Sequence, residues 1–270
     1  MPDITALYAG APEQEWRRLD RDAFHRLEYD TTLHFLTPLL PATGRILDAG
    51  GGPGRYSITL AKRGLQVTLL DLTPELLAIA RHEAGRAGVQ AAITCEQGTI
   101  TDLSRYPDDA FEAVLCLGGP LSHVADATQR AVAARELARV VRPGGLVAVG
   151  VMGRLAVVIE AAAYWPQEIA SQATWQGLWR DGEDEHFVGQ YHCHFFLPEE
   201  LEALLIAAGL QVHTRVGLEG IGSHHWDAVN RLAEEAPQSY AYWLEAHLAL
   251  CTHPAIVASS GHILMIARKP

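Results

Sequence analysis

The sequence predicts an α/β fold in which helices cover both faces of a seven-stranded, mostly parallel sheet. From residue 45 onward, short apolar runs alternate with helical patterns, which is the arrangement of βαβ units. A glycine-rich run directly follows the first apolar run, at the place where open α/β sheets bind their ligands. The chain is 49% hydrophobic and 20% charged, so it has enough apolar material for a large core and is not disordered.

Seven short apolar runs are expected to form the strands of this sheet. Their length and their content of Val, Ile and Leu are typical of strands buried on both faces. The expected strands are 46–48, 67–71, 92–95, 113–117, 146–151, 210–216 and His262–Arg268.

Helix start and stop signals separate these strands. Thr73 as N-cap and Pro74 at the first helical position begin a helix that ends before Gly88. A second helix is expected over 127–141, where the RPGG turn at 142–145 stops it. Further helices are expected in 198–209 and 224–250.

The domain organisation predicted from these patterns is one decorated domain. About 150 residues per domain is typical, so 270 residues fit two domains or one domain with an insertion. Residues 1–44 are amphipathic and predict a helical cap before the first strand. Residues 45–270 then form the α/β domain, and a second cap is inserted after the fifth strand at about 152–196. Both caps are expected to cover the carboxyl ends of the strands.

Charge and targeting signals argue against a nucleic-acid binder, a secreted protein and a membrane-spanning protein. The formal net charge of −11 argues against a strong binder of nucleic-acid backbone, since each neutralised phosphate needs a Lys or Arg. Residues 1–16 carry acids and prolines where a secretory signal has a basic start and an apolar run. No apolar stretch reaches the ~18 residues that span a bilayer, and the four cysteines form no C-x-x-C pair. A reduced, cytoplasmic protein without membrane contact is expected.

The glycine run at residues 50–54 is the most informative motif of the chain. Glycines after a strand permit positive φ and let a ligand approach the backbone closely, and the next helix offers free N–H groups. A phosphate-binding P-loop needs a Lys-Ser or Lys-Thr pair that is absent here. A dinucleotide fingerprint that begins at Gly50 would meet Arg55 at its third glycine position. Neither of these two motifs therefore fits.

The run does fit the pattern D-x-G-x-G-x-G, with Asp48, Gly50, Gly52 and Gly54 at the specified positions. With this pattern the sequence resembles the class I S-adenosylmethionine-dependent methyltransferases, which have a Rossmann-like fold. Four further segments match the family's motifs in order: Asp71 after the second strand, 98–100 after the third, 111–117 in the fourth, and 142–146 at the turn into the fifth. The resemblance covers residues 45–152 and implies S-adenosyl-L-methionine as the cofactor.

The resemblance also implies which residues contact this cofactor. The backbone of the glycine run around Asp48 would contact the methionine part, and Asp71 with Leu72 would contact the ribose. Thr99 and Ile100 would lie against the adenine, and Leu117 near the amino group. The family commonly has an Asp where this chain has Thr99, so a carboxylate contact with the adenine amino group is absent.

Aromatic residues of the two caps have two interpretations. The segment expected to close over the cofactor carries Tyr8, Trp16, Glu28 and Tyr29. Its aromatic residues would shield the sulfonium and offer cation–π contact, or else form the apolar side of a packed helix. Tyr8 is the residue of this group predicted to contact the cofactor. The inserted cap carries Trp165, Trp175 and Trp179, which either line an acceptor pocket or form the core of the cap.

A general base is needed only if the acceptor is protonated at pH 7, because the methyl group of a sulfonium is already activated. His123, in the loop after the fourth strand, is the predicted catalytic residue, and a purely structural role is its alternative. His192, His194, His224 and His225 are further candidates. His192 and His194 would share one face of a strand, but no second ligand pair accompanies them, so no metal site is predicted.

Three functions are compatible with these motifs. The favoured one is methyl transfer to an N, O or C nucleophile of a small-molecule acceptor. The second is a nucleic-acid enzyme, because the loop 47–52 and a carboxyl-terminal helix pair ending in residues 267–270 look similar to a tRNA wobble-uridine carboxyl methyltransferase. The third is a cofactor-binding protein without catalysis. Nucleic acid is the less favoured partner because of the net charge, and the sequence predicts no oligomeric state.

Overall fold

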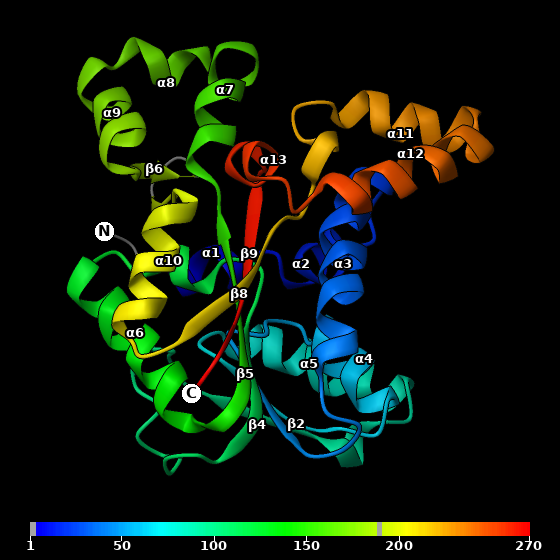
Figure 1. Ribbon diagram of the computed structural model, residues 1–270, viewed down its shortest axis with the longest axis vertical. Helices are drawn as coiled ribbons and strands as arrows, with labels where there is room; N and C mark the ends of the chain where they lie inside the picture. The colour runs from blue at the N-terminus through cyan, green and yellow to red at the C-terminus, as the bar shows by residue number, and fades with distance from the viewer. Residues whose placement is uncertain (1–3, 188–190) are drawn as a thin grey trace.

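The computed structural model describes the backbone of residues 4–187 and 191–270. A seven-stranded sheet in the order β3-β2-β1-β4-β5-β9-β8 forms its centre (Figure 1). Strands β1 to β5 pair in parallel, and β9 runs antiparallel to β5 and β8, which confirms the predicted mostly parallel sheet. The strands of this sheet are β1 Arg45–Ala49, β2 Gln66–Asp71, β3 Ile93–Gln97, β4 Phe111–Cys116, β5 Val141–Met152, β8 Gln211–Gly217 and β9 His262–Arg268.

Helices cover both faces of the sheet. Before and between the parallel strands lie α1 Ile4–Ala9, α2 Pro12–Arg18, α3 Ala23–Leu36, α4 Arg55–Lys62, α5 Pro74–Arg86 and α6 Ala127–Val140. After β5 follow α7 Arg154–Tyr164, α8 Pro166–Ala170, α9 Gln172–Gln176, α10 Pro198–Ala207, α11 Trp226–Glu235, α12 Pro237–Leu250 and α13 Pro254–Ser259. Among the described residues no helix is long and apolar enough to cross a bilayer.

Two buried clusters form the core, one on each face of the sheet. Ile46 and Leu47 are neighbours in β1, yet they belong to different clusters, because successive side chains of a strand point to opposite faces. Leu47 packs in the cluster that contains Leu137 of α6 and Leu205 of α10, and Ile46 in the one that contains Leu60 of α4. Figure 1 shows α6 and α10 on one side of the sheet and α3 and α4 on the other. Burial on both faces explains the near-continuous apolar runs of the strands.

Segments that follow β5 gather at one end of the sheet. In Figure 1, α7–α9 and α11–α12 extend from the same end, on either side of α13. Within the segment 152–196, β6 Glu183–Phe187 pairs with β7 Tyr191–His194 as a separate antiparallel sheet. His192 and His194 therefore lie on a strand, as predicted. The domain boundaries drawn at residues 44, 152 and 196 stay predictions.

Three local predictions need correction. The RPGG segment at 142–145 does not precede β5 but is part of it, because the Gly144 N–H donates to the Lys269 carbonyl (2.8 Å) and keeps the backbone paired. Thr73 does precede α5, but its side chain caps nothing; its own N–H donates to Asp71 Oδ1 (2.8 Å). Ala267 and Arg268 belong to β9, so the expected helix pair does not extend to these residues.

Candidate active site

A cavity of about 600 Å³ lies beyond the carboxyl ends of β1, β2 and β4. It brings together most of the side chains and glycines that the sequence predicts as cofactor-binding or catalytic. Those that line it are Tyr8, Gly50, Gly52, Asp71, Leu72, Thr99, Ile100, Leu117 and His123. Parallel strands place their following loops at one edge of the sheet, so residues far apart in the sequence meet there.

The glycine loop forms one wall of this cavity in a conformation that requires glycine. Gly50 and Gly52 have φ values of +78° and +53°, in the left-handed region. A Cβ atom on Gly50 would lie 2.4 Å from Cγ of Pro120, so there is no room for a side chain. The Gly50 N–H donates to the Leu70 carbonyl of β2 (2.6 Å). The loop therefore presents bare backbone to the cavity from a fixed position.

Asp71 connects the glycine loop with the start of α5. Its Oδ2 accepts the Gly52 N–H and its Oδ1 accepts the Thr73 N–H, each at 2.8 Å. Burial raises the pKa of Asp71, and these backbone hydrogen bonds act in the opposite direction. Each carboxylate oxygen keeps a second lone pair, so Asp71 can still accept hydrogen bonds from a ligand in the cavity.

Asp48 and Gly54 lie outside the cavity lining. Asp48 is fully buried beneath the loop, where its Oδ2 accepts the Ser57 hydroxyl (2.7 Å) and its Oδ1 has no hydrogen-bond partner among the described residues. Burial raises the pKa of Asp48 to about 6. Gly54 has a φ of +84° and adjoins Leu69 and Ala80. In this structure both residues shape the loop from below.

Tyr8 and His123 form a pair at the cavity. Tyr8 comes from α1 and His123 from the single turn Pro120–His123 after β4, and the Tyr8 hydroxyl lies 2.8 Å from His123 Nε2. Burial lowers the pKa of His123 to about 4, and a hydrogen bond with the His192 backbone acts in the opposite direction. Burial also raises the pKa of Tyr8. At neutral pH the pair is thus an uncharged imidazole beside a protonated phenol.

The pattern of residues 1–44 did not point to an ion-pair network that reaches the cavity from α2. Arg18 lines the cavity and donates to Glu15 (2.9 Å) and Glu28 (2.5 Å). The Arg18 guanidinium holds the pKa of Glu28 at about 2 against the opposing effect of burial. Behind Glu28, His262 pairs with Glu219 (2.6 Å). The spacing of Glu15 and Arg18 on one helix face was a local signal, but the partners from α3 and β9 are visible only in the fold.

The other candidate histidines separate into two groups. His192 lines the cavity. His194 is 1% exposed and lies between the carboxylates of Glu183 (2.9 Å) and Glu200 (2.6 Å). His224 contacts Glu160 (2.9 Å), and His225 is exposed at the start of α11. Of the candidates named from the sequence, only His123 and His192 are among the described residues that line the cavity.

A metal-binding arrangement occurs elsewhere. Within residues 4–187 and 191–270, Glu28, Glu219 and His262 place one ligand atom each within 4.8 Å of one another. Their charges are already compensated by Arg18 and by the His262–Glu219 pair. His192 and His194 are not members of this group.

The tryptophans of the inserted segment do not line the cavity. Trp165 lies near Trp226 (6.3 Å between ring centroids), Trp175 packs against Leu178, Cys193 and Phe195, and Trp179 is 44% exposed. None of the three tryptophans is therefore among the described residues that line this cavity, and which of their two interpretations holds stays open.

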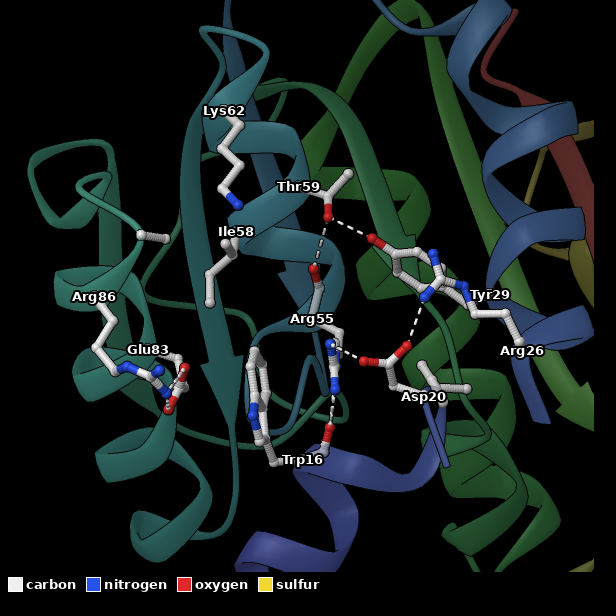
Figure 2. Close-up of a pocket in the computed structure, with 12 residues that line it drawn as sticks. Trp16, Asp20, Arg26, Tyr29, Arg55, Ile58, Thr59, Lys62, Glu83 and Arg86 are labelled. Carbon is white, nitrogen blue, oxygen red and sulfur yellow. Dashed lines mark hydrogen bonds and ion pairs between the residues drawn. The ribbon is translucent and has the colours of Figure 1, made fainter. Parts of the chain in front are cut away.

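Aromatic residues of α2 and α3 line a second, smaller cavity of about 340 Å³ (Figure 2). Trp16 lies beneath the guanidinium of Arg55 (4.0 Å to the ring centroid), and Arg55 donates to the Trp16 carbonyl. The Tyr29 hydroxyl contacts Thr59 of α4 (2.5 Å). Trp16 and Tyr29 thus attach the amino-terminal helices to the outside of α4, and of the aromatic residues named above only Tyr8 lines the larger cavity.

Comparisons with known proteins agree with this geometry. Residues 46–145 match the family model described as a methyltransferase domain. The ubiquinone biosynthesis O-methyltransferase of Xanthomonas axonopodis pv. citri is 32% identical over 194 residues, which cover 72% of this chain and 71% of the relative.

Solved structures share the fold. A SAM-dependent methyltransferase from Methanosarcina mazei aligns with a TM-score of 0.61 at 18% identity, covering 87% of this chain and 96% of that one. The [4+2]-cyclase SpnF aligns with a TM-score of 0.56 at 21% identity, covering 91% of this chain and 80% of that one. Because a cyclase shares this fold, the fold alone does not identify the reaction.

Proposed function

The chain belongs to the class I S-adenosylmethionine-dependent methyltransferases, and on this premise we propose that it methylates a hydroxyl oxygen of a small-molecule acceptor. The cofactor supplies a methyl group on a sulfonium; an incoming nucleophile can bond to this carbon while the sulfur leaves as a neutral thioether, without covalent help from the protein. The observation that carries the proposal is the Tyr8–His123 pair, which places a neutral imidazole in the same cavity as the glycine loop.

The cofactor would occupy the part of the cavity that the glycine loop and Asp71 line. Bare backbone at Gly50 and Gly52 suits close contact with the methionine part, and the free lone pairs of Asp71 suit the ribose hydroxyls. Thr99 and Ile100 would lie against the adenine, and Leu117 near the amino group. Asp48 would act indirectly, by supporting the loop from below.

The acceptor would meet Tyr8 and His123. A hydroxyl is a weak nucleophile while it keeps its proton, since phenols have pKa values of about 10. His123 is uncharged at neutral pH because burial lowers its pKa to about 4. A base of this strength does not deprotonate a phenol beforehand, so the imidazole would accept the proton as the oxygen attacks. In that one step the oxygen would form a bond with the methyl carbon, the carbon–sulfur bond would break, and the proton would pass to His123.

The identity of the relatives favours oxygen over nitrogen or carbon as the acceptor atom. The relative from Xanthomonas axonopodis pv. citri is described as an O-methyltransferase, and it is similar over 72% of this chain. The net charge of −11 favours a small molecule over tRNA, since phosphate contacts require cationic side chains.

Methyl transfer from isotopically labelled S-adenosylmethionine tests the proposal. A panel of phenols, amines and total small RNA is offered to the purified protein, and the label is followed into each product. We expect label in phenol ethers. Label in amines or RNA alone, or in none of the three, would contradict hydroxyl methylation.

A further inference from the structure

Two buried polar atoms meet beside the cavity without a hydrogen bond. His192 Nε2 and Glu183 Oε2 lie 3.0 Å apart, but their geometry is not that of a hydrogen bond, and neither atom has another partner within the described residues. The two atoms face each other at ion-pair distance and both are shielded from solvent, so Glu183 fixes the orientation of the His192 ring beside the cavity. His192 lines the cavity and its side chain is 11% exposed.

Arg130 connects Glu183 with the cavity wall. Arg130 is 5% exposed, and its Nη2 donates to Glu183 Oε1 (3.0 Å). Its Nη1 donates to the carbonyls of Val124 and Ala125, each at 2.9 Å, and both of these residues line the cavity. One guanidinium thus holds the loop after β4 and the carboxylate of β6 at a fixed separation. This orients Glu183 relative to the cavity.

Glu200 and Glu183 contact the two sides of His194 in a nearly symmetrical way. His194 contacts Glu183 through Nδ1 (2.9 Å) and Glu200 through Nε2 (2.6 Å). Glu200 pairs with the buried Arg154 (2.6 Å), as Glu183 pairs with Arg130. Both glutamates therefore contact one histidine and one buried arginine. Only Glu183 also contacts a histidine that lines the cavity.

We propose that His192 is an acceptor-binding residue for a second polar group of the substrate, and that Glu183 is its positioning residue. The proposal rests on the proposed function, because it assigns the part of the acceptor next to the reacting hydroxyl. His192 and His123 line the same cavity, and the His123 imidazole contacts the His192 backbone, so the two residues would meet neighbouring parts of one ligand. The substrate class is a small molecule with a hydrogen-bonding group close to the methylated hydroxyl.

The test compares two probes that differ by one hydroxyl. Binding of catechol and of phenol is measured by calorimetry in the presence of saturating S-adenosylhomocysteine. We expect the wild type to bind catechol about tenfold more tightly than phenol, as a buried polar site discriminates against a ligand that leaves it unpaired. Glu183→Gln and His192→Gln are expected to reduce this preference to less than about twofold.

Glu200→Gln is the matched control, since it removes the same charge from the other side of His194. We expect it to retain the catechol preference. Equal preference in Glu183→Gln and Glu200→Gln would overturn the inference, as would a wild type that binds both probes equally or neither. His192→Gln reports on the same contact independently if Glu183→Gln fails to fold.

Failure of the inference and failure of the proposed function are distinguishable. The probe preference is measured without turnover, whereas the proposed function is judged by label transfer to any phenol. Labelled phenol ethers together with no catechol preference would overturn the inference alone. Affinity for S-adenosylhomocysteine and melting temperature are recorded for each variant, and we expect both to match the wild type in His192→Gln.

Discussion

The two walls of the large cavity are built in different ways. The glycine-loop wall is made of backbone and one carboxylate, and its key contact joins Gly52 and Asp71, which are 19 residues apart. The other wall comes from distant segments: Tyr8 and His123, which line the cavity, are 115 residues apart, and Arg130 and Glu183, which support it from outside the lining, are 53 apart. Local geometry determines the first wall, and tertiary packing assembles the second.

Because they are built differently, the two walls should respond differently to substitution. Changes in the glycine-loop wall should act on cofactor affinity, because they alter backbone that is fixed by φ angles and by Asp71. Changes in the side-chain wall should act on turnover and leave cofactor affinity intact. A glycine-loop variant with normal cofactor affinity, or a side-chain variant with weakened cofactor affinity, would contradict this division.

Removal of the carboxylate at the glycine-loop wall should have the largest effect. Asp71→Ala leaves the N–H groups of Gly52 and Thr73 without partners and deletes the acceptor expected for the ribose. Hydrogen bonds to charged groups are worth about 1.5–3 kcal/mol each, so affinity for S-adenosylhomocysteine should fall by about 10²–10⁴-fold. Calorimetry measures this, with the exposed Asp102→Ala as control. Unchanged affinity would remove Asp71 from the cofactor site.

Loss of the imidazole at the side-chain wall should act on turnover alone. His123→Gln removes the group expected to accept the hydroxyl proton, and general bases contribute about 10²–10⁴-fold to rate. We expect kcat to fall within that range while affinity for S-adenosylhomocysteine stays within about twofold. His225→Gln, on an exposed histidine, serves as control. A reduced affinity for S-adenosylhomocysteine together with a normal kcat would show that His123 belongs to the cofactor-binding wall.

A methyl group on the glycine loop should strain the first wall. In Gly50→Ala the new Cβ would meet Pro120 at 2.4 Å and the residue would keep a φ of +78°. Strained backbone of this kind costs about 1–3 kcal/mol, so cofactor affinity should fall by about 10–100-fold. Gly64→Ala is a control that carries the cost of a positive φ without a steric clash. Gly64 has a φ of +92° but no atom within 4 Å of its Cβ position. Equal effects of the two variants on cofactor affinity would argue against a role of Pro120.

The buried carboxyl beneath the loop should make stability depend on pH. Burial raises the pKa of Asp48 from 3.8 to about 6, so its contribution to stability is present below about pH 4 and is lost as pH rises through 6. Asp48→Asn keeps a neutral group beside Ser57 and should stabilise the fold by about 1–3 kcal/mol at pH 8, with little effect at pH 4. Denaturant unfolding at both pH values checks this. Destabilisation at pH 8 would show that the charged form is the favoured one.

Removal of the Tyr8 hydroxyl should have the smallest effect. Tyr8→Phe keeps the ring against His123 and deletes one hydrogen bond. A neutral hydrogen bond is worth about 0.5–1.5 kcal/mol, so kcat should fall by about 3–10-fold. Steady-state kinetics with the acceptor found in the labelling panel measures the change. A loss as large as that of His123→Gln would mean that Tyr8 itself takes part in proton transfer.

The α/β fold and most of the glycine-loop wall were predictable because their signals are local. Strand patterns, the glycine run and Asp71 each depend on neighbours within a few residues or on one βα unit. Predictions failed where local rules compete with pairing to distant backbone. The RPGG segment is a turn by composition, yet it remains in β5 because Lys269 lies opposite it.

The side chains of the second wall were only partly predictable. His192 and His194 are alike in the sequence, and only the packing of β7 directs one to the cavity and the other between two glutamates. Glu183 and Arg130 have no motif, since ion pairs between distant segments leave no periodic pattern. The tryptophans of the inserted segment are apolar by type, and only tertiary packing placed Trp175 against the buried cluster of the cap and left Trp179 44% exposed.

The sequence alone therefore determined the sheet, because strands and turns depend on backbone conformation that glycine, proline and β-branched residues dictate locally. Its ordered motifs also indicated the class of enzyme and the cofactor, through their resemblance to a known family. The tertiary structure alone decided which histidine contacts His123, which glutamate lies beside that histidine, and which helix brings Tyr8 to the cavity. Those contacts join side chains from different segments, and their free energy depends on burial and charge that exist only after the chain has folded.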